Sequence, residues 1–191
     1  MNLIENPPNR PPPFLETERL LLRRPRIEDA EAIYQGWTAD PEVTRYMTWA
    51  PHQSLAETCA FLQRSIESWR AAGSRATPEY VYIIEDRETN AVMGTIGLRP
   101  ESMKAELGYC LAREYWNNGY MTEAVKAIIN WGLRPAAYQR VQAFCDAENI
   151  GSARVMEKSG MSYEGTLKSY LHSPNIERKR LRDAKLFAAT K

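Results

Sequence analysis

The stretch of this chain with the clearest chemical potential is a tight turn at residues 117–120, which read Asn-Asn-Gly-Tyr. It lies between an apolar run ending at Leu111 and a helical pattern of apolar residues starting at Met121. Successive amides of such a turn, with the unpaired N–H groups of the next helix, form a concave site for phosphate oxygens. Asparagine and glycine tolerate the left-handed backbone that this requires. A plain turn without a ligand is an equally good interpretation of the pattern alone. If an anion binds, main-chain amides must hold it, because the turn contains no lysine or arginine.

Glu106 is the side chain best suited to accept a proton. It alternates with Ala105 and Leu107 on an expected central strand, where partial burial raises the pKa of a carboxyl group. A solvated glutamate at a strand end is the competing interpretation. Cys110 alternates onto the same face, but neither flanking segment contains a histidine, so we expect its thiol to pack in the core.

Composition limits the possible functions. The 191 residues suit one domain, and 43 % apolar with 26 % charged residues is typical of a globular protein. The net charge of +1 makes nucleic acid an unexpected partner. Three cysteines without a CxxC spacing, Cys59, Cys110 and Cys145, argue against a disulfide framework and a cysteine-rich zinc site. No run of residues suggests export or membrane insertion, so we expect a cytoplasmic protein. The sequence leaves open whether it is a monomer or a homodimer.

The N-terminus is rich in proline. Five of residues 7–13 are prolines, which fix φ and remove backbone donors. We therefore expect residues 1–14 to form a flexible arm outside a single domain at 15–191. A ligand for a proline-binding module is the alternative role for this arm.

Hydrophobic spacing in the first half predicts a strand within 17–25, an amphipathic helix over 27–37 and a loop over 40–53 with one more helical turn. Ser54 and Glu57 have the spacing of a capping box, which predicts a helix that starts there and ends at Ala72-Gly73. Strands are expected at 80–85, 92–98 and 105–111, as an antiparallel meander.

The second half has a different order. A helix around 121–129 separates the third meander strand from a strand at 140–145, so these two strands should be parallel. A helix over 150–159 and two strands near 162–171 and 181–188 complete the chain, with His172 in the loop between the strands. His52 and His172 are both expected to be isolated surface residues. The fold class is α+β, a mixed sheet with helices on both faces.

Three blocks of sequence resemble one family. The run Trp116-Asn117-Asn118-Gly119-Tyr120-Met121 resembles the acyl-CoA pyrophosphate loop of the GNAT N-acetyltransferase superfamily, Gln/Arg-x-x-Gly-x-Gly/Ala. Residues 149–161 resemble the pattern N-x-x-S-x-x-V-x-E-K-x-G-F of its RimJ/RimL-like branch, which acetylates protein N-termini. Residues 15–20, LETERL, and Met93-Gly94 with Gly97 are similar to that branch as well. The resemblance covers nearly all the chain after the arm.

The resemblance implies acetyl-CoA as co-substrate and an amine as acceptor, joined by direct attack of the amine on the thioester without a metal. It implies a GNAT-like mixed, mostly antiparallel sheet that is splayed open at the CoA site. It places the pantetheine against the backbone of Leu111 and Arg113, whose strand also steadies the oxyanion. Asn149 would bond the pantetheine amide or only cap its helix, and Ser152 would contact the same arm or only close the first helical turn. The implied cofactor-binding residues are therefore Leu111, Arg113, Trp116, Asn117, Asn118, Gly119, Tyr120, Met121, Thr122, Asn149 and Ser152, with Glu106 as the catalytic base.

Three residues depart from the family pattern. Asn117 and Met121 stand where the loop often has glycine or another small residue. Met156 stands where many relatives have the tyrosine that protonates the thiolate, so the proton would come from water or from the nascent ammonium. These departures favour one alternative, an acyl-CoA-binding sensor with weakened turnover. A second alternative is a structural protein that uses the proline arm and binds no CoA.

The acceptor is a primary amine that the sequence leaves open, either a protein N-terminus or a small molecule. The loops at 40–53 and 172–178 are expected to select it.

Overall fold

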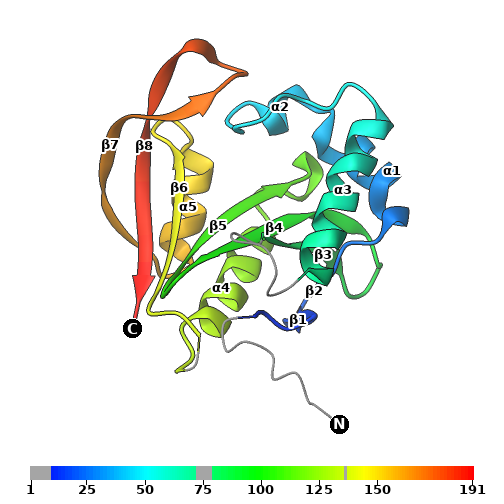
Figure 1. Ribbon diagram of the computed structural model, residues 1–191, viewed down its shortest axis with the longest axis horizontal. Coiled ribbons are helices and arrows are strands. Elements are labelled where there is room, and N and C mark those ends of the chain that lie inside the picture. The colour runs from blue at the N-terminus through cyan, green and yellow to red at the C-terminus, as the bar shows by residue number, and fades with distance from the viewer. Residues whose placement is uncertain (1–9, 72–78, 136) are drawn as a thin grey trace.

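The computed structural model describes residues 10–71, 79–135 and 137–191. Their framework is an eight-stranded sheet with the strand order β1-β2-β3-β4-β5-β6-β8-β7 (Figure 1). All neighbouring strands are antiparallel except β5 and β6, which are parallel. The strands are β1 (Phe14–Glu16), β2 (Leu20–Arg23), β3 (Tyr80–Asp86), β4 (Val92–Glu101), β5 (Lys104–Leu111), β6 (Arg140–Asp146), β7 (Ser162–Ser173) and β8 (Glu177–Thr190).

Helices cover both faces of this sheet. On β5, Leu107 and Leu111 face the cluster that contains α4, whereas Cys110 faces the cluster that contains α1. The strand therefore separates two apolar cores, as the two-residue period of a strand requires. The helical segments are η1 (Ile27–Asp29), α1 (Ala30–Ile33), the π-helical η2 (Tyr34–Thr38), α2 (Pro41–Thr44), α3 (Leu55–Arg70), η3 (Arg113–Tyr115), α4 (Tyr120–Gly132) and α5 (Ile150–Lys158).

The predicted fold class is confirmed. The meander is present as β3, β4 and β5, and the helix α4 connects β5 to the parallel strand β6. Gly160 has φ of 87° just after α5 and ends that helix as predicted. The predicted mixed sheet with helices on both faces therefore describes this chain.

The predicted start of α3 at Ser54 is confirmed, but the predicted hydrogen bonds of a capping box are wrong. Ser54 is the N-cap residue, but its side chain makes no cap hydrogen bond. The Glu57 carboxylate instead accepts a hydrogen bond from the Gln53 amide, at 3.0 Å. The predicted end of this helix at Ala72-Gly73 lies outside the described residues.

The predicted flexible arm was wrong for residues 10–14. Arg10 donates a hydrogen bond to the Trp69 carbonyl at 2.7 Å, and the Tyr82 hydroxyl donates one to the Pro12 carbonyl at 2.6 Å. Phe14 begins β1, an edge strand that pairs with β2. Proline lacks a backbone donor but keeps its carbonyl, and this carbonyl attaches the arm to the domain. Residues 1–9 lie outside the described part of the chain.

The last two strands are longer than predicted, since β8 begins at Glu177 rather than near Leu181. They form a hairpin whose end lies near α2 (Figure 1). Among the described residues, no helix combines the length and the apolar character needed to cross a membrane.

Candidate functional site

The turn before α4 has the geometry of an anion-binding nest. Asn117 has φ of 63° and Gly119 has φ of 79°, both left-handed, whereas Asn118 does not share this conformation. Across the described chain, no group accepts a hydrogen bond from any of the six backbone amides of residues 117–122. Gly119 is the N-cap residue of α4 and has no side chain to cap it. Six consecutive unused donors at the positive end of a 13-residue helix form a site for an anion.

A cation that the sequence interpretation missed lies beside this turn. Arg19, between β1 and β2, donates a hydrogen bond to the Asn118 carbonyl at 3.1 Å. Its guanidinium lies 4.3 Å from the centre of the Tyr120 ring and forms an ion pair with Glu123 at 2.7 Å. Two of the blocks that carry the family resemblance, residues 15–20 and 116–121, thus meet here. Their joint presence was the signal that could have placed Arg19 at the turn.

The Glu123 carboxylate connects the N-terminal segment to the loop. Burial alone would raise the pKa of Glu123, but hydrogen bonds from the Thr17 hydroxyl and from Arg19 outweigh it and lower that pKa. Tyr120, Met121 and Thr122 form the first turn of α4 between these contacts, and the Met121 side chain is buried in the core. Tyr120 therefore stacks on Arg19, and Met121 packs inward.

The parallel strands β5 and β6 separate next to this turn. Their pairing begins at Lys104 with Arg140 and ends at Leu107 with Ala143. Beyond that point β5 stays paired with β4 up to Leu111, and β6 stays paired with β8 up to Asp146. The two strands meet at one end and diverge toward the other (Figure 1). Within the described part of the chain, their facing edges have no strand partner from residues 108 and 144 onward, which agrees with the predicted splay.

Trp116 and Leu111 have a specific relation at this opening. The Trp116 indole N–H donates a hydrogen bond to the Leu111 carbonyl at 2.7 Å. This bond fixes the turn to the end of β5, and it occupies one lone pair of the carbonyl that the resemblance assigns to the pantetheine. The Asn118 side chain donates to the Trp116 carbonyl at 2.9 Å, so it also shapes the loop.

Arg113 connects the end of β5 to the N-terminus of α2. Its guanidinium pairs with the Asp40 carboxylate at 2.8 Å. Asp40 caps α2 by accepting a hydrogen bond from the Glu42 amide. The segment after β5 is therefore attached to the 40–53 loop.

Asn149 and Ser152 lie at the start of α5. The Asn149 side chain accepts a hydrogen bond from the Ser152 amide at 3.0 Å, so its capping role is confirmed. The Ser152 hydroxyl lies 2.8 Å from the Tyr109 hydroxyl of β5. Burial raises the pKa of Tyr109, so this phenol stays neutral and connects β5 to α5. Met156, where the family often has a tyrosine, is fully buried in the core.

Glu106 lies on β5 opposite Gln142, where β5 and β6 are still paired. Its side chain is 35 % exposed, and its carboxylate accepts a hydrogen bond from Arg99 at 3.2 Å. Arg99 also contacts Glu79, at 3.4 Å. Glu106 is therefore half-exposed beside a cation, on the face of the sheet opposite α4.

Cys110 packs as predicted. It is buried in the cluster with α1, and burial raises the pKa of its thiol to about 12. A thiol that stays protonated at neutral pH is a poor nucleophile.

His52 is not the isolated surface residue that the sequence predicts. Its Nδ1 lies 2.8 Å from the Thr58 hydroxyl, and its ring lies between those of Trp49 and Phe61, with centroids 5.4 and 6.4 Å away. Burial lowers the pKa of His52. The nearby Glu57 carboxylate raises this pKa and Arg64 lowers it, but burial has the largest effect. Its packing in the 40–53 loop could not be read from the sequence, because the spacing of loop residues has no period.

We expect the lowered pKa of His52 to make the protein less stable in mild acid. A histidine whose pKa is lower in the folded than in the unfolded state binds its proton more readily when the protein unfolds. The free energy of unfolding is therefore unaffected at pH values above the unfolded-state pKa, near 6.5, and decreases as the pH falls below that value. The wild-type melting temperature should therefore fall more between neutral pH and about pH 5 than that of His52→Gln. Equal pH dependence of the two melting temperatures, measured by circular dichroism, would show that His52 is not responsible.

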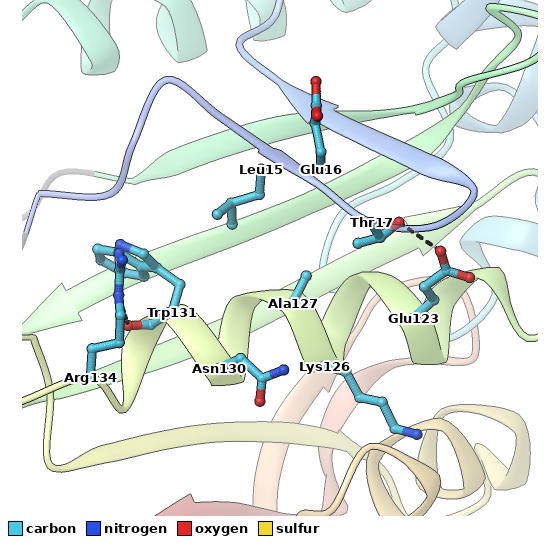
Figure 2. A pocket seen from close by; sticks show the side chains of 9 residues that line it. All are labelled: Leu15, Glu16, Thr17, Glu123, Lys126, Ala127, Asn130, Trp131 and Arg134. Atoms are coloured by element: carbon cyan, nitrogen blue, oxygen red, sulfur yellow. Dashed lines mark hydrogen bonds between the residues drawn. The ribbon is translucent and has the colours of Figure 1, made fainter.

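A separate open groove of about 500 Å³ runs between β1 and one flank of α4. Figure 2 shows Leu15 and Thr17 on one side and Lys126, Asn130 and Arg134 along the helix on the other. Strands β2, β3 and β4 separate β1 from the splayed pair. We therefore place the candidate site at the splay and the 117–122 turn, where the unused polar groups of the backbone are.

Within residues 10–71, 79–135 and 137–191, no group of three or more His, Cys, Asp or Glu side chains is placed to hold a metal ion.

Comparisons with known proteins agree with this geometry. The model of the acetyltransferase (GNAT) domain family matches residues 19–162. The uncharacterized N-acetyltransferase p20 of Bacillus licheniformis is 33 % identical over 160 residues, which is 82 % of this chain and 86 % of that protein. A GNAT-family acetyltransferase structure from Bacillus anthracis is 27 % identical, with a TM-score of 0.77, and the match covers 93 % of this chain and 98 % of that one.

One further structure, RimL, a ribosomal L7/L12 alpha-N-protein acetyltransferase in complex with coenzyme A, shares the fold at 19 % identity. Its TM-score is 0.75, and the match covers 93 % of this chain and 97 % of that one. The family model spans the turn, the splay and α5, which are the elements that form the candidate site. The chain therefore belongs to the GNAT acetyltransferase family, and it shares its fold with RimL.

Proposed function

We propose that this protein transfers an acetyl group from acetyl-CoA to a primary amine in a ternary complex. The observation that carries the proposal is the row of six unused amides at residues 117–122, next to the open edge of β5. Together they offer an anion site and a strand edge, which match the pyrophosphate and the amide-containing pantetheine of acetyl-CoA.

The 117–122 amides bind the pyrophosphate in this proposal. Arg19 is close enough to add positive charge to the site, and Trp116 and Asn118 hold the loop in shape. The pantetheine lies along the splayed end of β5, next to the backbone of Leu111 and Arg113. Asn149 and Ser152 of α5 border the same opening.

The reaction is direct aminolysis. The neutral amine forms a bond to the acetyl carbon, the carbonyl oxygen becomes an oxyanion, and the C–S bond then breaks. Amides of the β5 edge stabilise the oxyanion. An acceptor that arrives as an ammonium first gives one proton to the base and becomes the neutral amine. After the attack, its nitrogen gives a second proton to the departing CoA sulfur, through water or directly, and the product is an amide and the CoA thiol.

Glu106 is the proposed base. Its carboxylate is half-exposed on the face of the sheet opposite α4, where an amine can reach it. Arg99 holds it in place. An α-amine, with a pKa near 8, needs far less help to lose its proton than a lysine side chain, with a pKa near 10.4. A protein N-terminus or a small-molecule amine of similar basicity is therefore the proposed acceptor class.

Asn149 allows a test that separates capping from cofactor binding. Asn149→Asp keeps the oxygen that caps the Ser152 amide but removes the side-chain N–H donor. We expect it to retain the melting temperature and to lose about 1 to 2 kcal/mol of acetyl-CoA binding free energy. Asn149→Ala should lose both. If Asn149→Asp binds acetyl-CoA normally in calorimetry, Asn149 is a cap only.

The proposed activity is tested by incubating the protein with acetyl-CoA and a panel of amines, with CoA release and product mass as readouts. The panel contains N-terminal peptides, free amino acids and polyamines. We expect a mass increase of one acetyl group on at least one α-amine. Tight acetyl-CoA binding without turnover on any amine would instead favour the acyl-CoA sensor, an alternative supported by Met156 at the position of the missing acid.

A further inference from the structure

The end of the β7–β8 hairpin and the 40–53 loop contact each other through one side chain. The Asn175 amide nitrogen donates hydrogen bonds to the carbonyls of Thr44 and Trp49, at 2.6 and 2.8 Å. Ser173, in the same turn, is fully buried. The two loops expected to select the acceptor therefore form one continuous border, at the end of the sheet where β5 and β6 diverge (Figure 1).

The hairpin has an unusual bulge beside this border. The β7–β8 register passes from Leu171 opposite Arg182 directly to Ser173 opposite Glu177. The four residues 178–181 on β8 therefore face only His172 on β7. Bulges of this kind turn side chains away from the ladder and are common next to active sites. The bulged residues are Arg178, Lys179, Arg180 and Leu181, and all four are exposed.

The three cations of the bulge are not neutralised. No carboxylate in the described part of the chain forms an ion pair with any of them. The Arg178 guanidinium contacts only the Pro174 carbonyl, at 3.4 Å, and Glu177 accepts a bond from the backbone amide of Lys179. Other hairpin cations do have partners, since Arg182 pairs with Asp146 and Lys168 pairs with Asp183.

Positive charge is concentrated on this hairpin. Residues 162–190 contain six Lys or Arg against three Asp or Glu, in a chain whose totals are 25 and 24. Arg45, which follows Thr44 across the border, is exposed and adds a further cation. Three acidic side chains lie close in sequence to this area, namely Glu42, Glu177 and Asp183, and Asp183 is already paired with Lys168. Unpaired like charges repel one another, so their clustering indicates an anionic partner.

Exposed apolar side chains on the same hairpin indicate what kind of anionic partner binds there. Leu181 is 51 % exposed within the bulge, and Tyr170 is 48 % exposed on the neighbouring strand. Small anions and nucleic-acid backbones offer little apolar surface, whereas a polypeptide can contact cations and a leucine together.

From these contacts we propose that the 178–181 bulge docks an acidic polypeptide segment that follows the N-terminal amine of the acceptor protein. This inference rests on the proposed function, because the docked segment is taken to belong to the acetyl acceptor. It narrows the acceptor class from any primary amine to the N-terminus of a protein with an acidic N-terminal segment. The bulge binds the acidic segment, and the border formed by Asn175 leads the amine toward the splay.

The test uses the double variant Lys179→Glu/Arg180→Glu and a control of equal charge change on α3, Arg64→Glu/Arg70→Glu. Arg178 is left intact because it contacts the turn. The probes are two fluorescent pentapeptides with a free N-terminal alanine, followed by four aspartates or by four lysines. Binding is measured by fluorescence anisotropy at low and high salt, and acetyl-CoA binding by each protein is measured by calorimetry.

We expect the wild type and the α3 control to bind the acidic peptide on the order of tenfold more tightly than the basic peptide at low salt. The bulge variant should lose or reverse this preference, and high salt should weaken it. Equal binding of both peptides by the wild type, or an unchanged preference in the bulge variant, would overturn the inference. So would a single-stranded RNA that binds the bulge more tightly than the acidic peptide. Acetyl-CoA binding is read separately, so a failure there counts against the proposed function and not against the docking surface.

Discussion

Gly119→Val should abolish measurable acetyl-CoA binding while the protein remains folded. Gly119 has φ of 79° at the N-cap of α4, a conformation that costs a β-branched residue about 1 to 3 kcal/mol. The backbone there should move toward an ordinary conformation, which turns the 117–122 amides away from a common point. An anion whose hydrogen bonds come mainly from aligned amides loses most of them in that change.

The matched control for this variant is Gly160→Val. Gly160 has a similar φ of 87°, and a Cβ there would meet nothing within 4 Å, but it lies after the last turn of α5 rather than at the nest. Both variants should lose comparable thermal stability, whereas only Gly119→Val should lose acetyl-CoA binding in calorimetry. Equal affinity in both folded variants would mean that the turn does not bind the cofactor.

Glu106→Gln should lower kcat by about 10²-fold or more at neutral pH, because it keeps the shape of the side chain and removes its basicity. Acetyl-CoA affinity should hardly change, since Glu106 lies where β5 and β6 are still paired. The deficit should shrink as the pH rises, because an amine already deprotonated in solution needs no base.

Glu79→Gln is the control for Glu106→Gln, since both carboxylates contact Arg99. If loss of the Arg99 contact alone lowers activity, both variants should be impaired to the same extent. A Glu106→Gln enzyme with wild-type kcat at every pH would leave catalysis to positioning and the oxyanion site.

Much of the fold followed from the sequence because its signals were local. The period of apolar residues in 121–129 and the alternation along 105–111 specify which faces are buried, and β5 and α4 follow these patterns. Gly119 and Asn117 indicated the left-handed turn because few other residues adopt it readily.

Other features could not be predicted, because they depend on contacts between distant segments. Arg19 reaches Asn118 and Glu123 only when the N-terminal strands pack near the start of α4. The 178–181 bulge depends on how β7 and β8 align, and alignment is weakly specified in an exposed edge hairpin. The attachment of Pro12 to Tyr82 was missed because the composition of the arm suggests a solvated chain.

An NMR titration of the ¹⁵N-labelled protein with acetyl-CoA tests the proposed cofactor site most directly, because it follows each backbone amide. The six amides of residues 117–122 have no acceptor within the described structure, so we expect them to show the largest downfield shifts, together with amides at 108–111 on β5. Amides beside the β1–α4 groove, such as Leu15 and Asn130, should change little. Saturable shifts confined to that groove, or no shifts at millimolar acetyl-CoA, would contradict the account.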